Sequence, residues 1–468
     1  MPIACLFAAL NLASPFSDHA VLQAGRCVPV WGAADVGASV RVSFAGKTLE
    51  TKTDARGVWR VDLSPLEASE VGRNLVVTSG SDRTVVRDVV VGEVWLCAGQ
   101  SNMELKLWPC ASVGQHSGRE TDGYFDCQAV DEPFVRAFSV AKDWAVEPQS
   151  VLRKEARWIP FTSGACGDLS AVAFHYALSL RRVLKCPIGV IVTAWGGTPI
   201  QSWTPDAESG CVLQGENPGA KRLHRQPRVL WNAMVAPLAP YAAKGMIWYQ
   251  GEDNRGSGLD YAKLLEDLSE GWSQAFGLPL LPFYMVEIAP FDYRLWETDD
   301  LMYRTEIREA QHTFAKTRPN AACVSTVDIG DQESIHPDNK RTVALRLAAN
   351  ALNRTYGILR IACESPELER WDVHGDTVTL TFRNVKAWNR NGRDPMPFEI
   401  ASETGAFCPA GAKLVSSNQI EVTSCFVGKP ARLRYAWSWL QTGRLKNESG
   451  YPLAPFRIGD LKKNREKK

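Results

Sequence analysis

The sequence lacks any long uninterrupted apolar stretch and any marked excess of one charge. No apolar run reaches the roughly 18–20 positions that a membrane-spanning helix needs. The 53 basic and 52 acidic side chains leave a formal net charge of +1, so electrostatics gives no reason to expect binding to nucleic acid or to a membrane surface. A chain of 468 residues with this balance has room for two or three globular domains.

Cysteine and histidine do not occur in the patterns that bind metals. The twelve cysteines include no Cys-x-x-Cys pair and no Cys/His cluster of zinc spacing, so we expect neither a metal site nor a cofactor. Cys408 and Cys425 flank a strand-like stretch, and the sequence leaves open whether they form a disulfide. Met1–Leu12 is apolar but has no basic n-region, so we do not interpret it as an intact signal peptide. The compartment stays open: periplasmic or extracellular if a signal peptide was removed, and cytoplasmic otherwise. The oligomeric state is open as well.

Periodicity divides the chain into three parts. Residues 1–91 alternate apolar and polar positions in short runs, which predicts an antiparallel β-sandwich domain. Residues 92–358 alternate apolar strands with helical stretches, which predicts an α/β catalytic domain built on a parallel sheet with helices on both faces. Residues 359–468 return to short strands, which predicts a β-rich segment that ends in a basic tail at 461–468.

The expected elements follow this division. The predicted strands of the first part are 28–31, 40–44, 58–63, 75–78 and 84–91. Those of the α/β part are 94–98, 189–194, 244–249, 282–288 and 322–328, and its predicted helices are 171–184, 261–276, 305–315 and 340–353. The C-terminal strands are expected at 377–382, 398–400, 419–422 and 431–435.

The most informative segment is 92–104, with the sequence Gly-Glu-Val-Trp-Leu-Cys-Ala-Gly-Gln-Ser-Asn-Met-Glu. The apolar run Val94–Ala98 predicts a buried strand that ends at Gly99 and delivers Ser101 to the start of a helix. This position suits a nucleophile, because the N–H groups at the start of a helix face a developing oxyanion. An ordinary turn with a capping serine has the same local pattern, so this segment alone does not decide the role.

A serine nucleophile needs a base, and the chain has only seven histidines. His336 follows the apolar run 321–329, and Pro337 fixes the chain just before a helical pattern. Glu333 stands three residues earlier, a spacing at which a carboxylate in a turn reaches an imidazole. The other histidines lie in loops, turns or helical patterns, where a surface or core role is the simpler interpretation: His19, His116, His175, His224, His312 and His374.

Polar motifs follow the predicted strands at the points where those strands end. Ser101 follows the first strand of the α/β part, Gly196-Gly197 the second, Gln250 the third, and His336 comes shortly after the last. The carboxyl ends of parallel strands meet at one edge of a sheet, so we expect these groups to form an active site there.

Four motifs occur in a defined order: Gly99-Gln-Ser-Asn-Met103, Trp195-Gly-Gly-Thr198, Ile247-Trp-Tyr-Gln-Gly-Glu252 and Ile335-His-Pro337. In this order they resemble the sialate O-acetylesterase family, which belongs to the SGNH (GDSL-like) serine esterases. The resemblance covers nearly the whole chain. Further segments resemble the family's opening β-domain, its catalytic domain and its C-terminal segment, in that order: Ser14–Gln23 and Pro29–Gly32; Asn232–Leu238 and Arg308–Gln311; Arg434–Trp437 and Pro452–Phe456.

Acyl-transfer chemistry assigns roles to these residues. Ser101 attacks the ester carbonyl, and His336 accepts the serine proton, returns one to the departing alcohol, and then activates water against the acyl-enzyme. The predicted oxyanion donors are the backbone N–H groups of Ser101 and of Gly196 or Gly197, together with the side-chain amide of Gln250. The alternative role for Gln250 is a structural hydrogen bond within its loop.

Four neighbouring residues are expected to support the site: Gln100, Asn102, Glu252 and Asn254. We expect Glu252 to brace the site, and Asn102 to position the Ser101 turn or to touch substrate. One departure from the family pattern lies here, because many members carry a small residue at the position of Asp253. Its extra carboxylate either alters substrate preference or faces solvent.

The acid that orients His336 is less well defined. Related SGNH enzymes place an aspartate three residues before the histidine, where this chain has Glu333. Asp328, Asp331 or a backbone carbonyl are alternatives, and the last of these would leave a Ser–His dyad.

The resemblance implies removal of O-acetyl groups from sialic acids, with acetate as a product. A carboxylated sugar needs a cationic partner, for which Arg308 is a candidate by its family-like context; a salt bridge on a helix face is the alternative. Other acetylated carbohydrates such as xylan are a second class of substrate. A non-catalytic glycan-binding protein is the alternative from another functional class.

Overall fold

The computed structural model describes residues 10–108, 110, 121–207, 222–295, 302–389, 396–439 and 443–459. The chain divides into two compact units, of which the first comprises 1–112, 118–253 and 263–283. The second comprises 113–117, 254–262 and 284–468. Most of the apolar N-terminus, the basic tail at 461–468 and His116 lie outside the described residues.

The N-terminal part of the first unit consists mainly of antiparallel strands. One sheet contains β1 (Asn11–Leu12), β3 (Val28–Ala33) and β6 (Val58–Leu63), and a second group joins β4 (Ser39–Phe44), β5 (Lys47–Lys52) and β7 (Ser69–Ser79) to β8 (Asp82–Gly99). Exposed and buried side chains alternate along β6, which is the pattern of a strand with one face in the core. The strands predicted between residues 28 and 91 are thus confirmed.

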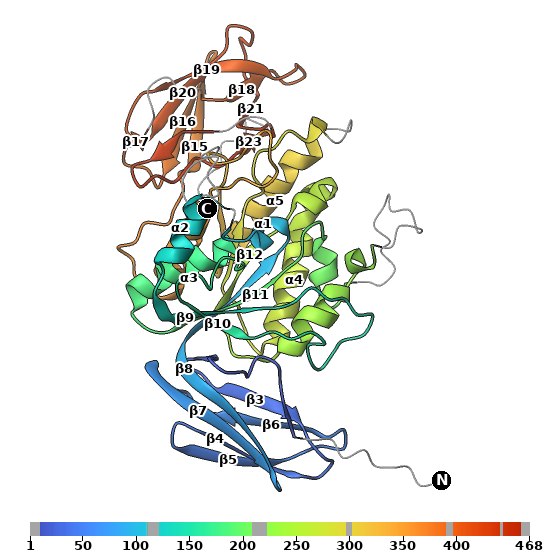
Figure 1. Cartoon of the computed structure of the whole chain (residues 1–468). Coiled ribbons are helices and arrows are strands. Elements are labelled where there is room, and N and C mark those ends of the chain that lie inside the picture. The colour runs from blue at the N-terminus through green and yellow to red at the C-terminus, as the bar shows by residue number, and fades with distance from the viewer. Residues whose placement is uncertain are drawn as a thin grey trace. The chain divides into compact units, whose positions relative to one another are not determined.

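β8 is the element that joins the N-terminal strands to the α/β sheet (Figure 1). The sequence predicts two strands, at 84–91 and 94–98, whereas the structure has one strand of 18 residues. Its first half pairs antiparallel with β7, and residues 90–92 pair parallel with β2 (Val21–Gln23). Its second half pairs parallel with β11 (Ile188–Ala194) and β12 (Gly245–Tyr249).

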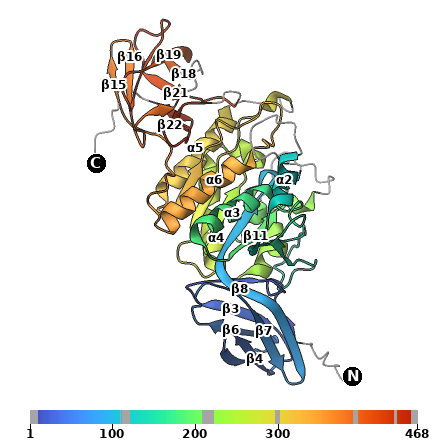
Figure 2. The same cartoon turned by 60° about the vertical axis from the view of Figure 1, so that its left-hand side comes forward.

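The α/β sheet of the first unit has the strand order β10-β9-β11-β8-β12. β9 (Glu132–Ser139) is parallel to β11, but β10 (Trp158–Phe161) is antiparallel to β9, so the sheet is mixed and not purely parallel as predicted. The helix prediction for 171–184 matches α3 (Ala171–Leu184), which packs against β11 (Figure 2). α3 begins where the Ser170 side chain accepts a hydrogen bond from the Ala173 N–H. The other helices that contribute to this unit are α1 (Ser101–Glu104), α2 (Thr121–Ala129) and α4 (Tyr261–Ala275).

The register of three parallel strands places their ends in one row. Gly99 of β8 is opposite Ala194 of β11 on one side and opposite Tyr249 of β12 on the other. The residues that follow each strand therefore leave the sheet at the same level and on the same edge.

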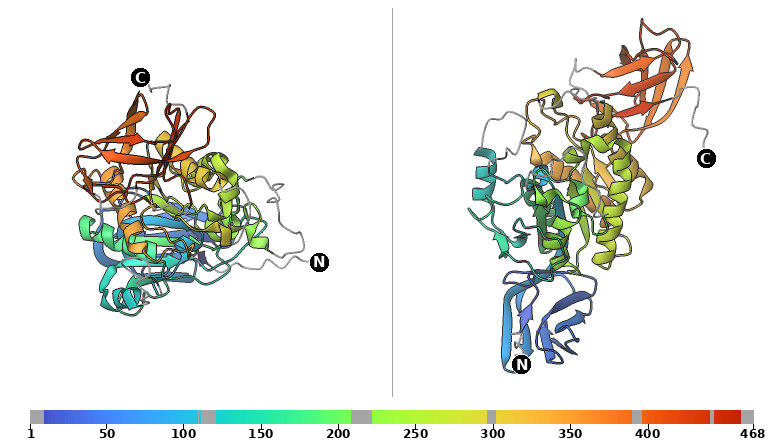
Figure 3. Two further views of the ribbon diagram at one scale, coloured as in Figure 1. Left: turned by 90° about the horizontal axis from the view of Figure 1, so that it is seen from above. Right: turned by 90° about the vertical axis from the view of Figure 1, so that its right-hand side faces the viewer.

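In its described residues, the second unit contains two short strands, two α-helices and a C-terminal antiparallel sheet. The first elements are β13 (Phe283–Val286), α5 (Met302–Thr317), β14 (Ala321–Val324) and α6 (Lys340–Asn350). The C-terminal sheet, seen in Figure 3, has the order β15 (Glu367–His374), β16 (Thr377–Arg383), β20 (Gln419–Thr423), β19 (Cys408–Leu414), β18 (Phe398–Ala401), β21 (Arg432–Tyr435) and β23 (Phe456–Ile458). A further pair is β17 (Trp388–Asn389) with β22 (Lys446–Asn447).

The C-terminal strands predicted from the sequence are confirmed, and their inward side chains form one apolar cluster that includes Leu380, Phe382, Ile420 and Leu433. Cys408 and Cys425 are both free thiols. Among the described residues, no helix is long and apolar enough to cross a membrane.

A buried tyrosine ties the N-terminal strands to the α/β part within the first unit. The Tyr241 hydroxyl donates a hydrogen bond of 2.7 Å to the Val21 carbonyl, and its ring packs near Phe16 and Trp158. Tyr241→Phe keeps the ring but leaves this buried carbonyl without its donor. We expect the free energy of unfolding to fall by about 1–2 kcal/mol in urea denaturation. The half-exposed Tyr124 is the control, because Tyr124→Phe should change the free energy of unfolding by less than about 0.5 kcal/mol. Equal losses in the two variants would show that the hydrogen bond from Tyr241 to Val21 does not stabilise the fold.

Candidate active site

The chain turns sharply between the end of β8 and Ser101. Gly99 has a φ of +147°, and a Cβ atom at this position would lie 2.2 Å from the Tyr249 carbonyl oxygen. Only glycine fits such an approach. The Gln100 N–H then donates to the same carbonyl at 3.0 Å, and Ser101 is the first residue of α1. The structure thus confirms that Ser101 stands at a strand end and opens a helix.

The residues on both sides of Ser101 are tied to the loop that follows β12. The Gln100 side-chain oxygen accepts hydrogen bonds from the backbone N–H groups of Gly251 (3.2 Å) and Asp253 (3.4 Å). The buried Asn102 amide donates to a Glu252 carboxylate oxygen at 2.6 Å. A charge-assisted bond of this kind is among the stronger ones in proteins, so these three hydrogen bonds hold the serine turn in one position.

The Trp195-Gly196 turn lies directly against Ser101. The Trp195 N–H donates to the Gly99 carbonyl at 3.2 Å. A Cβ atom at Gly196 would lie 3.1 Å from the Ser101 Cβ, so a larger residue would push against the serine. The Gly196 N–H itself donates to a Glu104 carboxylate oxygen at 2.7 Å. Of the two glycines predicted as oxyanion donors, Gly196 therefore has its N–H bound to Glu104.

Two ion pairs fix this turn from different sides. Glu104 pairs with Lys142, whose ammonium lies 5.7 Å from the centroid of the Trp195 ring. Arg225 donates to the Gly197 carbonyl at 2.5 Å and to the Asp253 carboxylate at 2.7 Å. Asp253 is the residue that departs from the family pattern, and Arg225 neutralises its carboxylate. The side chains of Arg225 and Asp253 are each only 13% exposed.

The sequence analysis missed these cations. Lys142 lies in a loop and Arg225 ends the short 3₁₀ helix η2 (Leu223–Arg225). Both lie far along the chain from the residues that they contact, and no local pattern marks them. His224, which the sequence analysis assigned to a loop, stacks on Trp195 with ring centroids 4.6 Å apart and planes 6° apart. Only the tertiary structure brings this short 3₁₀ helix to the glycine turn.

Gln250 is fully buried at the end of β12, and its amide nitrogen donates to the Thr198 carbonyl at 3.1 Å. This is the structural hydrogen bond considered as the alternative to an oxyanion role. A carboxamide nitrogen carries two hydrogens, and this bond uses one of them.

His336 lies in the second unit, in a turn that begins at Asp331. The Asp331 carboxylate accepts the Glu333 N–H at 2.8 Å. The Ser334 hydroxyl contacts both the N–H and the carbonyl of His336 at 3.1 Å. Glu333 itself is exposed, and within the described part of the chain its carboxylate makes no hydrogen bond or ion pair. Thus Asp331 and Ser334 shape the turn that carries the histidine.

Asp328, the third acid considered for His336, has other partners. It is bound by Arg346 at 2.7 Å and by Lys446 at 2.7 Å. Burial alone would raise its pKa, but these two cations hold the pKa of Asp328 below its ordinary value. Its carboxylate therefore remains charged and serves an ion pair.

Arg308 is buried on α5 and is only 1% exposed. Its guanidinium Nε lies 3.9 Å from a carboxylate oxygen of Glu287, which also contacts His312 at 2.7 Å. Burial opposes protonation of His312, but contacts with Cys323 and Glu287 raise the pKa of His312 to about 10. Arg308 thus takes part in a buried charge network, as in the salt-bridge alternative.

The structure therefore groups the predicted residues in two sets. The first unit brings together Gln100, Ser101, Asn102, Gly196, Gly197, Gln250 and Glu252, and the second contains Asn254, Arg308, Glu333 and His336. Asn254 is 4% exposed and follows Glu252 in the 3₁₀ segment Glu252–Asp260. Within the described ranges, no cluster of three or more His, Cys, Asp or Glu side chains is arranged to hold a metal ion.

The family model described as "Carbohydrate esterase, sialic acid-specific acetylesterase" matches residues 91–353. The chain belongs to this family.

Relatives from animals and from one bacterium are similar to this chain over nearly its whole length. The human sialate O-acetylesterase is 28% identical to it, covering 95% of this chain and 92% of the human protein. The orangutan protein (Pongo abelii) of the same name gives the same values. A carbohydrate acetylesterase from Xanthomonas citri is 32% identical and superposes with a TM-score of 0.86, covering 96% of this chain and 99% of that one. The family member is accordingly a carboxylic ester hydrolase.

Two substitutions at Glu104 separate its hydrogen bond from its ion pair. Glu104→Gln retains an oxygen that accepts the Gly196 N–H, whereas Glu104→Ala removes this acceptor. Because an exposed ion pair contributes only about 0–1 kcal/mol, we expect Glu104→Gln to keep kcat on 4-nitrophenyl acetate within about fivefold. Glu104→Ala should lose roughly tenfold or more, since the turn beside Ser101 is no longer held.

Lys142→Met is the matched control, because it removes the ion pair and leaves the Glu104–Gly196 hydrogen bond. It should behave as Glu104→Gln does. Equal losses of kcat in both Glu104 variants would show that the hydrogen bond between Glu104 and the Gly196 N–H does not contribute to catalysis.

Proposed function

We propose that this protein is a serine esterase of the SGNH type that removes O-acetyl groups from sialic acids and releases acetate through an acyl-enzyme. The observation that carries the proposal is the common register of β8, β11 and β12, which delivers Ser101, the Gly196-Gly197 turn and Gln250 to one edge. Family membership supports the same chemistry. The sialic acid substrate follows from the names of the relatives.

In this mechanism Ser101 is the nucleophile and His336 is the general base. As the serine oxygen attacks the acetyl carbonyl, its proton passes to the imidazole. The imidazolium then protonates the sugar oxygen as its bond to the acetyl carbon breaks, which releases the sugar with a free hydroxyl group. In the second half-reaction the imidazole takes a proton from water. Hydroxide attacks the acetyl-enzyme, acetate leaves, and the proton returns to Ser101.

The oxyanion needs donors about 2.7–3.1 Å from its position. We assign this role to the backbone N–H groups of Ser101 and Gly197 and to the Gln250 amide. The Gly196 N–H is less suitable, because Glu104 already accepts it. Gly196 instead allows the close approach of its turn to the serine. Gln100, Asn102 and Glu252 act as positioning residues for the serine turn, and Asn254 extends the same loop.

We retain Glu333 as the proposed orienting acid, with Asp331 shaping the turn through its hydrogen bond to the Glu333 N–H. The Glu333 carboxylate is exposed. Catalytic hydrogen bonds are often long before substrate binds and tighten in the complex.

Other acetylated carbohydrates are the second candidate substrate class. The relative from Xanthomonas citri, which is named a carbohydrate acetylesterase, is more similar to this chain than the animal relatives cited above are. Comparing initial rates on an O-acetylated sialic acid and on acetylated xylan distinguishes the two classes. Faster release of acetate from xylan would favour the second candidate.

Ser101→Ala should abolish hydrolysis of 4-nitrophenyl acetate, with a loss of at least about 10³-fold, because no other group forms the acyl-enzyme. Circular dichroism should show a folded protein. A fluorophosphonate should label Ser101 in the wild type and no serine in the variant, as peptide mass spectrometry can show. Near-normal kcat, or labelling of another serine, would overturn the assignment and leave a non-catalytic glycan-binding role open.

A second pair of variants identifies the acid that orients His336. Glu333→Gln removes the charge that stabilises the imidazolium, so we expect kcat/KM to fall roughly a hundredfold. Asp331→Asn retains an oxygen for the Glu333 N–H and should lose less than about fivefold. In the wild type, kcat/KM should rise with pH through one ionisation in the mildly acidic to neutral range, because the imidazole must be neutral to act as base.

The outcomes of this pair are distinct. A large loss only in Asp331→Asn would move the orienting role to Asp331. Small losses in both variants would indicate a Ser–His dyad whose imidazole is held by a backbone carbonyl.

A further inference from the structure

A loop of the first unit continues from the candidate active site along the same edge of the sheet. β9 is parallel to β11, and the Val140 N–H extends their pairing by donating to the Val192 carbonyl at 2.9 Å. Two residues later Lys142 pairs with Glu104 and lies against the Trp195 ring. The segment 143–154 therefore begins immediately beside the turn that contacts Ser101.

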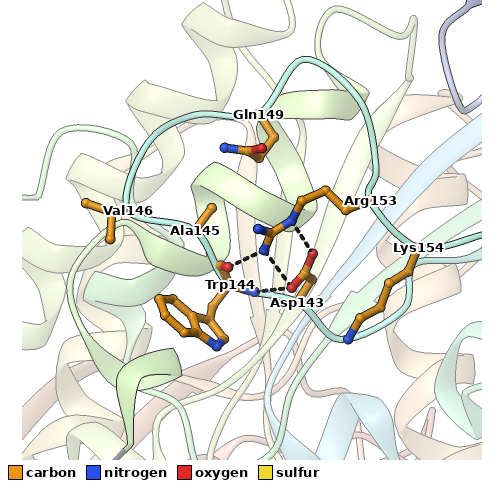
Figure 4. A pocket seen from close by; sticks show the side chains of 7 residues that line it. All are labelled: Asp143, Trp144, Ala145, Val146, Gln149, Arg153 and Lys154. Atoms are coloured by element: carbon orange, nitrogen blue, oxygen red, sulfur yellow. Dashed lines mark hydrogen bonds and ion pairs between the residues drawn. The ribbon is translucent and has the colours of Figure 1, made fainter.

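This segment lines an open hollow of about 600 Å³, which is within the range of small-molecule sites in proteins. Figure 4 shows the Arg153 guanidinium and the Asp143 carboxylate joined in its middle, with the Trp144 ring to one side and Lys154 to the other. Trp144 is 36% exposed. Ala145, Val146 and Gln149 complete the lining.

Hydrogen bonds hold the loop that lines the hollow. The buried Asn232 amide donates to the carbonyls of Ala145 (3.1 Å) and Val146 (2.6 Å), and its backbone carbonyl accepts the Gln149 N–H at 2.8 Å. Arg153 forms two bonds to Asp143, of 2.8 and 2.7 Å. A loop held in this way loses little conformational entropy when a ligand binds.

The lining has the chemistry that binds a sugar ring. An exposed indole offers an apolar face for the C–H groups of a pyranose, and the guanidinium, carboxylate and amide around it donate and accept hydrogen bonds from hydroxyl groups. Asp143 and Arg153 neutralise each other, so Lys154 leaves the lining with a net positive charge. This charge is compatible with neutral or carboxylated sugars.

Lys154 also links the hollow to the catalytic edge, because its ammonium donates to the Lys142 carbonyl at 2.5 Å. A ligand in the hollow would therefore lie next to the residue that contacts Glu104 and Trp195. This is the position expected for a neighbouring unit of the same glycan chain.

We propose that the hollow lined by Trp144, Gln149, Arg153 and Lys154 is a second sugar subsite, which binds the sugar linked to the acetylated residue. The enzyme then prefers acetylated residues within oligosaccharides over the free acetylated monosaccharide. This inference rests on the proposed function of Ser101 and its neighbours. It adds that the preferred substrate is longer than one sugar unit.

The test compares an O-acetylated sialic acid as the free monosaccharide with the same acetylated sialic acid linked to lactose. For the wild type we expect kcat/KM to be about tenfold higher on the linked substrate, mainly through a lower KM. Trp144→Ala should remove most of this advantage, whereas Trp144→Phe, which retains an aromatic face, should keep it within about threefold. Phe426→Ala is the matched control, because Phe426 is an exposed aromatic residue of the second unit.

Two results would overturn the subsite while leaving the proposed function intact. The first is that the wild type has equal kcat/KM values on both sialic acid substrates. The second is that Trp144→Ala and Phe426→Ala reduce the preference for the linked substrate equally. Cleavage of 4-nitrophenyl acetate without cleavage of either sialic acid substrate would instead overturn the proposed substrate, and this inference with it.

Discussion

The parallel pairing of β8 with β11 and β12 is the constraint on which the candidate site depends. It places Gly99, Ala194 and Tyr249 in one row, so the segments that follow them leave the sheet together. The close approach of the Gly99 backbone to the Tyr249 carbonyl is possible only without a side chain. A slip of one residue in either pairing would separate the serine turn from its partners and reverse the faces of the strands.

Charge pairs then hold the turns at this edge in a fixed arrangement. Glu104 accepts the Gly196 N–H and pairs with Lys142, while Arg225 binds both the Gly197 carbonyl and Asp253. Such contacts suit an esterase, because catalysis by acyl transfer depends on donors and nucleophile that are already in place before the reaction. Lys142 belongs at once to this arrangement and to the loop that lines the proposed sugar subsite.

The sequence predicted much of the fold because its apolar periodicity is strong. The helix at Ala171–Leu184 and the strand at Val58–Leu63 were predicted with the bounds that the structure has. β9 was missed, since its sequence combines a proline and two charged residues with apolar ones and lacks the continuous apolar run of β11. β8 was divided in two, because Gly92 and Glu93 interrupt an apolar run that the tertiary structure continues as one strand.

The sequence by itself determined the family, the α/β class and the position of Ser101 at the end of a strand, because motifs and local periodicity encode these properties. Only the tertiary structure decided which cations meet the glycine turn, that Arg308 lies in a buried network with Glu287, and that Trp144 and Arg153 share one hollow. The physical reason is that these contacts join residues from separate elements or from distant turns of one loop. Side-chain direction and burial, which local sequence does not encode, select them.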